Sequence, residues 1–193
     1  MFDKLMLGNH WNEGAIMQYV IFPPAGLDMP IIGPQADCLD PTSEMLAAYS
    51  YKYALTKDPN DRKIANEIFE AILRLEKVTG VSGLVARSFN QTDKPLWHEE
   101  VFWYNEWHQS SSMPNYRWLG DLSADKFTSI FYGVGTFWEF CADEAYKEKA
   151  SGLLDRFIGR VIDDNFKLTD LDGKMTLWGN FCPNLPHQEL NSL

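Results

Sequence analysis

Two aspartates in the segment "WLGDLSADK", Asp121 and Asp125, carry side chains that can do acid–base chemistry. Two carboxylates can hydrolyse a glycosidic bond when they lie about 5 to 9.5 Å apart, one as the acid and the other as base or nucleophile. The same residue type also caps helices and is favoured by the helix dipole in a first turn, which accounts for one of the two in most proteins. Because Asp121 and Asp125 are close in sequence, the partner acid can instead come from Asp37, Asp40 or Glu44.

Other groups that can bind a sugar occur in the same long segments. Arg87 in "GLVARSF" can hold a carboxylate such as that of a uronic acid, although tying down loop carbonyls or pairing with a loop acid is the commoner role. Trp118 and Trp178 offer flat rings that can stack on an apolar sugar face. Acids, a guanidinium and aromatic rings together fit a carbohydrate better than a lipid or a nucleotide. We expect catalytic roles for Asp121, Asp125, Asp40 and Glu44, and substrate binding by Asp37, Arg87, Trp118, Asp170 and Trp178.

We expect no metal ion and no other cofactor. His98, Glu99 and His108 have a spacing that matches no known metal-binding helix motif. The tetrapeptide "DLDG" lacks the further oxygen ligands and the late Glu of a calcium loop. Its Asp172 and Gly173 read instead as the tight turn of a β-hairpin in "KLTDLDGKMTLWG".

Composition excludes several classes of partner. The chain has 193 residues and a net charge of −10, from 27 acids and 17 Lys and Arg, so it would repel nucleic acid and anionic membrane surfaces. No apolar run is long enough to span a bilayer, and the start "MFDKLMLGNHW" lacks the features of a signal peptide, so we expect a soluble protein. We expect the three cysteines, Cys38, Cys141 and Cys182, to be thiols without a disulfide.

Four predicted helices must position these groups: about 40–56, 59–80, 123–141 and 143–165. The second and fourth are amphipathic, which predicts one face in water, whereas the first and third are apolar almost all round, which predicts burial on most sides. Inner and outer helices therefore alternate. Asp40 is expected to cap the first helix. Short links join each inner helix to the next outer one, and every long loop leads into an inner helix, so the loops should meet at one end of the array.

The pieces "DCLDPTSEMLAAYSYKYALTKDP", "RLEKVTGVSGLVARSF", "WLGDLSADKFTSIFYG", "VIDDNFKLTDLDGKMTLWGNF" and "ELNSL" together resemble the six-hairpin glycosidase-like families, most of all a bacterial branch with largely uncharacterised members. The resemblance covers residues from about 37 to 193. It implies an all-α fold class of repeated helical hairpins, a partial (α/α) toroid with long loops and a small β-hairpin. We expect a single domain, 1–193, with hairpins at about 40–80 and 123–165 and an irregular segment at 1–36, in which "AIMQYVIF" and "MPIIG" are short extended pieces.

Related toroids bind or cleave carbohydrate at the mouth formed by their loops, usually with two acids. The resemblance therefore implies a glycoside hydrolase that uses carboxylate acid–base catalysis. A non-catalytic sugar-binding or interaction scaffold, or an inactive fragment of a longer enzyme, stays open as the alternative. Two hairpins cannot close a ring of six, and "ELNSL" lies where the next inner helix should begin, so we expect a longer array. Its open apolar flanks predict a homo-oligomer.

Overall fold

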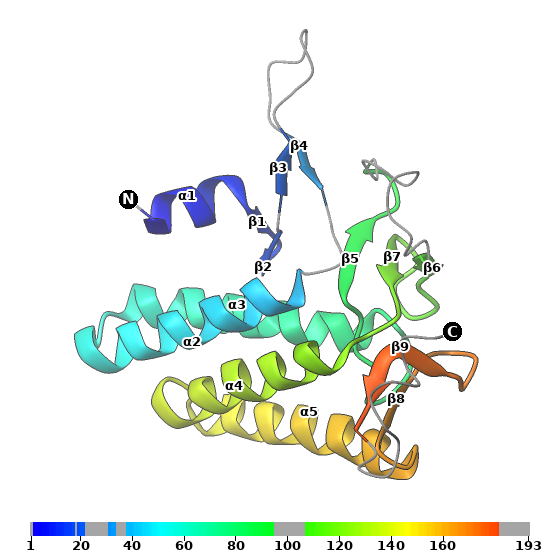
Figure 1. Ribbon diagram of the computed structural model, residues 1–193. Helices are drawn as coiled ribbons and strands as arrows, with labels where there is room; N and C mark the ends of the chain where they lie inside the picture. The colour runs from blue at the N-terminus through cyan, green and yellow to red at the C-terminus, as the bar shows by residue number, and fades with distance from the viewer. Residues whose placement is uncertain (1, 18, 22–30, 34–37, 95–106, 182–193) are drawn as a thin grey trace, which may run out of the picture.

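The computed structural model describes residues 2–17, 19–21, 31–33, 38–94 and 107–181 (Figure 1). Its helices are α1 (Phe2–Asn9), α2 (Leu39–Thr56), α3 (Pro59–Lys77), α4 (Ala124–Phe140) and α5 (Glu144–Asp163). The four helices predicted from the sequence correspond to α2 through α5.

Short strands occupy much of the remaining described chain. They are β1 (Trp11–Asn12), β2 (Ala15–Ile16), β3 (Tyr19–Ile21), β4 (Ile31–Gly33), β5 (Ser88–Gln91), β6 (Trp107–Gln109), β7 (Tyr116–Leu119), β8 (Lys167–Thr169) and β9 (Met175–Asn180). They form antiparallel pairs β1–β2, β3–β4 and β8–β9, and a three-stranded sheet in the order β5-β7-β6. The fold is therefore mixed α/β, and the predicted all-α class is wrong. Only the hairpin β8–β9 was predicted as a sheet.

Local sequence explains where the outer helices begin. Asp58 accepts a hydrogen bond from the backbone N–H of Asn60 and so caps α3, and Pro59 fits the first turn because it has no N–H to leave unpaired. Asp143 caps α5 in the same way, by accepting from Tyr146. The expected cap of α2 is wrong: this helix begins one residue before Asp40, whose carboxylate lies within the first turn and bonds to α4 instead.

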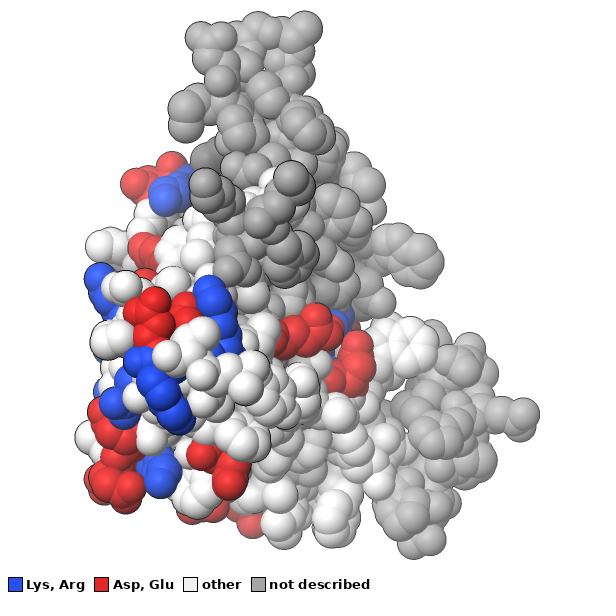
Figure 2. Space-filling model, turned by 90° about the vertical axis from the view of Figure 1, so that its left-hand side faces the viewer, with Lys and Arg blue, Asp and Glu red and all other residues white. Residues whose placement is uncertain are grey.

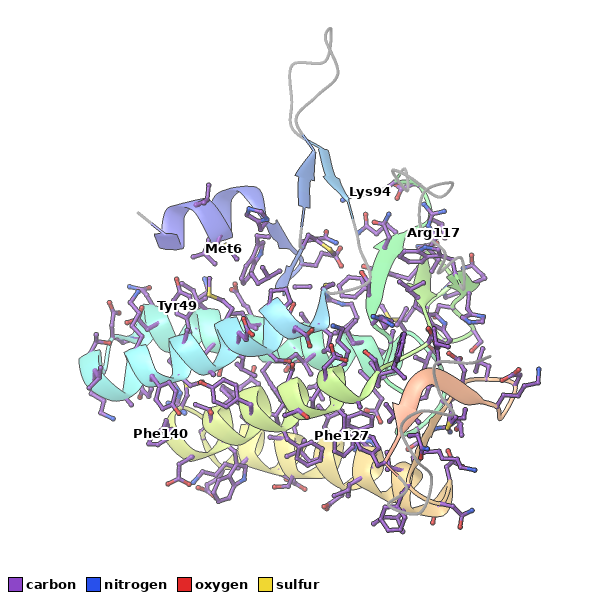
Figure 3. All side chains as sticks on the ribbon, viewed as in Figure 1. Met6, Tyr49, Lys94, Arg117, Phe127 and Phe140 are labelled. Carbon is purple, nitrogen blue, oxygen red and sulfur yellow. The ribbon has the colours of Figure 1, made fainter. Side chains whose placement is uncertain are left out.

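The helices pack as two hairpins, with α2 beside α4 and with α3 and α5 on their outer sides (Figure 1). Gly133 on α4 lies against the carbonyl of Ser43, where any side chain would overlap the backbone of α2, so the two inner helices pack closely. Phe69 on α3 stacks on Phe137 at 4.8 Å in the common core. Phe127, at the opposite end of α4 from Phe140, points toward α5, and its ring lies 5.0 Å from that of Phe157 (Figure 3).

The N-terminal segment is more regular than expected. It holds α1 and the strands β1 to β4, so the irregular assignment of residues 1–36 is wrong for its described part, whereas the extended character of "AIMQYVIF" and "MPIIG" is confirmed by β2, β3 and β4. The N–H of Ile16 donates to the hydroxyl of Thr42 at 2.9 Å, which fastens β2 to α2.

One face of the inner helices is open rather than buried. Tyr51 and Leu55 on α2, with Tyr132 and Phe140 on α4, are exposed, and the rings of Tyr51 and Phe140 lie 5.2 Å apart. We call these four residues the inner-helix face. A view onto the end of the molecule shows charged side chains gathered on the left, and to their right a described surface that is mostly uncharged apart from one group of acidic side chains (Figure 2). The predicted burial of both inner helices on most sides therefore fails along this face.

Candidate functional site

Three segments that are distant in sequence meet at the end of the molecule where α2 and α4 begin. The strands β5 to β7 and the hairpin β8–β9 lie at this same end (Figure 1). The hydroxyl of Thr176 on β9 donates to the carbonyl of Leu122 at 2.6 Å, and the N–H of Arg87 donates to Leu119 at 2.9 Å. The described parts of the loops before α4 and after α5 therefore converge as expected. The start of the next inner helix, predicted at "ELNSL", lies outside the described residues.

Asp121 is the centre of this convergence. Its backbone adopts a left-handed conformation, with φ of 56°, which a residue with a side chain adopts at some cost. Its N–H donates to Oδ2 of Asp170 at 2.7 Å, and its carbonyl accepts from Nη1 of Arg87 at 2.7 Å. Its own Oδ1 accepts from the N–H of Leu177 at 2.8 Å. Contacts from both neighbouring loops thus fix the backbone and the carboxylate of Asp121.

The environment of Asp121 favours the protonated acid. Burial raises the pKa of this carboxyl above its ordinary value. The hydrogen bond from Leu177 and the charge of Arg87 act in the opposite direction, whereas the nearby charge of Asp170 adds to the rise. An acid that holds its proton more tightly than usual is suited to protonating a leaving group.

Asp170 and Trp118 are buried beside the site and do not form part of its surface. Oδ1 of Asp170 accepts from the N–H of Leu171 at 2.7 Å and lies 3.9 Å from Nε2 of His108. The indole of Trp118 is 0% exposed, and its centroid lies 4.5 Å from the His108 ring. The prediction that Trp118 stacks on a sugar is therefore wrong, because β7 turns this side chain into the core. Asp170 is also buried, so we assign it to holding Asp121 rather than to a substrate.

Arg87 occupies a different environment from the one expected. Its side chain is buried, and besides the bond to the carbonyl of Asp121 its Nη1 lies 3.9 Å from the carboxylate of that residue. Arg87 therefore performs the commoner role of fastening a loop, and its expected grip on a uronic acid does not fit this geometry.

A second group of side chains lies at the first turns of α2 and α4. Nζ of Lys126 contacts Oδ2 of Asp40 and lies 3.2 Å from Oδ2 of Asp125. Ser129 donates to Oδ1 of Asp40 at 2.6 Å, and Ser123 donates to Oδ1 of Asp125. Two of the predicted catalytic acids, Asp40 and Asp125, are thus brought together from separate helices by one buried lysine.

The carboxyl of Asp125 is biased in the opposite sense to that of Asp121. Partial burial alone would raise the pKa of Asp125, but the hydrogen bond from Ser123 and the charge of Lys126 outweigh it and lower the pKa. The Asp125 side chain is 67% exposed, so its ionised carboxylate faces water. The pKa values of the two acids at the head of α4 are therefore shifted in opposite directions, and Asp125 is the more exposed of the two.

The other predicted site residues divide into two sets. Glu44 is exposed on α2, and Trp178 is 43% exposed on β9, next to the residue whose N–H binds Asp121. Asp37 lies outside the described residues, as do two of the three groups considered for a metal, His98 and Glu99. Within the part of the chain that the structure describes, no group of three His, Cys, Asp or Glu is arranged to hold a metal ion.

Two of the three cysteines, Cys38 and Cys141, lie in the described part of the chain. Cys38 and Cys141 are buried free thiols, and burial raises the pKa of each to about 11, whereas Cys182 falls in the segment that is not described. None of the described helices combines the length and the apolar character needed to cross a bilayer.

Two residues of the site were missed as such by the sequence reasoning. His108 was considered only as a metal ligand, and its position opposite Trp118 follows from the pairing of β6 with β7. Lys126 was not considered at all, because a lysine in a first helical turn is usually solvated. The signal that could have revealed Lys126 is the pattern Asp-Lys-x-x-Ser, which places Ser129 one turn later on the same side of α4.

Comparison of the chain with models of protein families, with curated proteins and with solved structures gave no significant match. The geometry described above therefore carries the functional argument.

Proposed function

We propose that this chain belongs to a carbohydrate-active protein, a glycoside hydrolase in which Asp121 is the acid and Asp125 the ionised partner that acts as base or nucleophile. One observation carries the proposal: two pairs of carboxylates, Asp121 with Asp170 and Asp40 with Asp125, are each assembled from distant segments at the end of the fold where α2 and α4 begin. Placing carboxylates close together is unfavourable unless each one has a cationic or hydrogen-bonding partner or is protonated. Active sites often contain such clusters of acids with shifted pKa values.

The chemical roles follow from the two environments. Asp121 is partly buried and its pKa is raised by that burial, which suits a general acid, whereas Asp125 is exposed and its pKa is lowered by Ser123 and Lys126, which suits a base or nucleophile. Trp178, with its exposed ring on β9, provides an apolar surface for sugar stacking beside Asp121.

Hydrolysis of a panel of aryl glycosides and polysaccharides tests the proposal. Asp121→Asn and Asp125→Asn should each lower kcat by at least about 100-fold on any substrate that is cleaved, because each removes a proton-transfer group. Both variants keep the size of the side chain, and Asn at position 121 can still accept from Leu177. Full activity in both variants would contradict the proposed roles.

Binding to the same panel tests the sugar itself. Trp178→Ala should weaken binding at least about 10-fold, the loss of one stacked ring. Trp138→Ala is the matched control, since this indole is 40% exposed at the other end of α4 and lies near Lys147. Binding without hydrolysis would favour the sugar-binding scaffold over the enzyme, and neither binding nor hydrolysis would contradict both.

A further inference from the structure

Lys126 occupies a position that is unfavourable for folding on two counts. It is 2% exposed, and a buried ammonium group loses hydration that only close partners can replace. It is also the third residue of α4, where the positive end of the helix dipole disfavours a cation by about 0.3 to 1 kcal/mol. Departures from local preference of this kind concentrate at functional sites.

The partners of Lys126 are not equivalent. Both carboxylate oxygens of Asp40 are engaged, Oδ1 by Ser129 and Oδ2 by Lys126, and this side chain is mostly buried. Asp125 also has one oxygen bonded by Ser123 and the other near Lys126, but it lies largely in water. Asp40 therefore anchors the ammonium group to α2, and Asp125 is the partner that a substrate can reach.

We propose that Lys126 is a positioning residue of the site, whose ammonium group, anchored by Asp40, holds the carboxylate of Asp125 at the head of α4 as the proton acceptor. This inference rests on the proposed function. Lys126 itself is too deeply buried to touch a substrate, so it acts through Asp125.

The charged and titratable groups around Lys126 support this assignment. From α2 the described residues present Asp40, and from α4 itself they present Asp125. Cys38, which precedes α2, stays a neutral thiol because burial raises its pKa to about 11. Within the described part of the chain, the ammonium group of Lys126 thus lies between the carboxylates of Asp40 and Asp125.

The first test needs no substrate. In the full chain, the titration of the Asp125 side-chain carboxyl is followed by ¹³C NMR in Lys126→Met, Lys126→Arg and a matched control, Lys147→Met. Lys147 is likewise near the start of a helix and pairs with Glu144 at 3.2 Å on α5. We expect the Asp125 midpoint to rise by about one pH unit in Lys126→Met, the lower end of the effect of a removed opposite charge. It should stay in place in Lys126→Arg and Lys147→Met.

The second test uses the substrate found in the panel. If Lys126 positions the base, the acidic limb of the kcat/KM profile moves upward in Lys126→Met by the same amount as the NMR midpoint and is restored in Lys126→Arg. A merely structural lysine would lower the unfolding temperature and leave this limb unchanged.

The outcomes separate the two proposals. An unmoved Asp125 midpoint or an unmoved acidic limb in folded Lys126→Met overturns the role of Lys126 and leaves the hydrolase standing. A wild-type protein that binds and cleaves no sugar overturns the hydrolase, and the positioning role with it. Should Lys126→Met not fold, the ¹⁵Nζ signal of wild-type Lys126 provides the reading: it should shift with the midpoint of Asp125, and an insensitive signal contradicts the pairing.

Discussion

Replacing Asp170 by alanine should loosen the junction of the two loops at Asp121. The Asp170 carboxylate accepts from two backbone N–H groups, those of Asp121 and Leu171, each at 2.7 Å. A hydrogen bond to a charged group contributes about 1.5 to 3 kcal/mol. Leu171 is exposed, so water can replace Asp170 there, whereas the N–H of Asp121 is held in a left-handed turn that costs about 1 kcal/mol by itself.

The bond to the N–H of Asp121 is the one that water does not replace, and its removal in Asp170→Ala should lower the free energy of unfolding by about 3 kcal/mol, the upper end of that range. For a chain of this size the unfolding temperature should fall by about 6 to 12 °C. Urea denaturation followed by circular dichroism measures the free energy, and differential scanning calorimetry measures the temperature.

Asp172→Ala is the control, because this aspartate lies on the same hairpin but is exposed in the turn beside Lys174. It should change stability much less. Equal urea midpoints for Asp170→Ala and Asp172→Ala would refute the reasoning, since they would mean that the bond to the N–H of Asp121 contributes nothing.

Four further predictions concern the rest of the fold. Glu76→Ala should cost about 2 kcal/mol in urea denaturation, because it removes the carboxylate that Arg156 binds through two nitrogens at 2.7 and 2.6 Å. Gly83→Ala should cost more than about 1 kcal/mol in the same assay, since its φ is 74° and a Cβ would overlap the Arg156 carbonyl. Because the pKa of Asp125 is lowered in the folded state, its carboxylate stabilises the fold at any pH above the ordinary pKa of Asp, and this stabilisation is lost as the pH falls through the folded pKa. Asp125→Asn should therefore have a lower unfolding temperature than wild type at pH 7, and the two should unfold at the same temperature in acid below the folded pKa of Asp125. We also propose a homo-oligomer that buries the inner-helix face, so Leu55→Lys should give a monomer in light scattering, and a wild-type monomer at high concentration would contradict this.

The helices could be predicted because their signals are local. Asp58-Pro59 and Asp143 provide start signals within one turn of the helices they cap, and the apolar stripes of α3 and α5 repeat over several turns. The strands of the sheet β5-β7-β6 could not be predicted in this way. They have three or four residues each, too few for a period of two to stand out, and β5 pairs with β7 across a long loop.

The sequence predicted which acids lie at the site better than it predicted what each residue of the site does. Asp121, Asp125 and Asp40 do lie at one end of the fold, because acids before inner helices must gather there. Asp170 was expected to face a substrate, but it instead accepts a hydrogen bond from the N–H of Asp121. The left-handed backbone of Asp121, which directs this N–H, could not be predicted from a sequence pattern. Trp118 was placed at the surface for its ring, but the register of β7 decided its direction.

The same contacts that make Asp121 a candidate acid also join the loops. Its N–H, its carbonyl and its Oδ1 bind Asp170, Arg87 and Leu177 in turn, so loss of activity after a change at those partners would not separate chemistry from folding. Asp121→Asn does separate them: it keeps the size and shape of the side chain and an acceptor for Leu177, and it removes the carboxyl group's ability to donate a proton as an acid. Unchanged stability with lost hydrolysis in that variant would assign the burial of Asp121 to catalysis, because a purely structural carboxyl loses nothing chemical on becoming an amide.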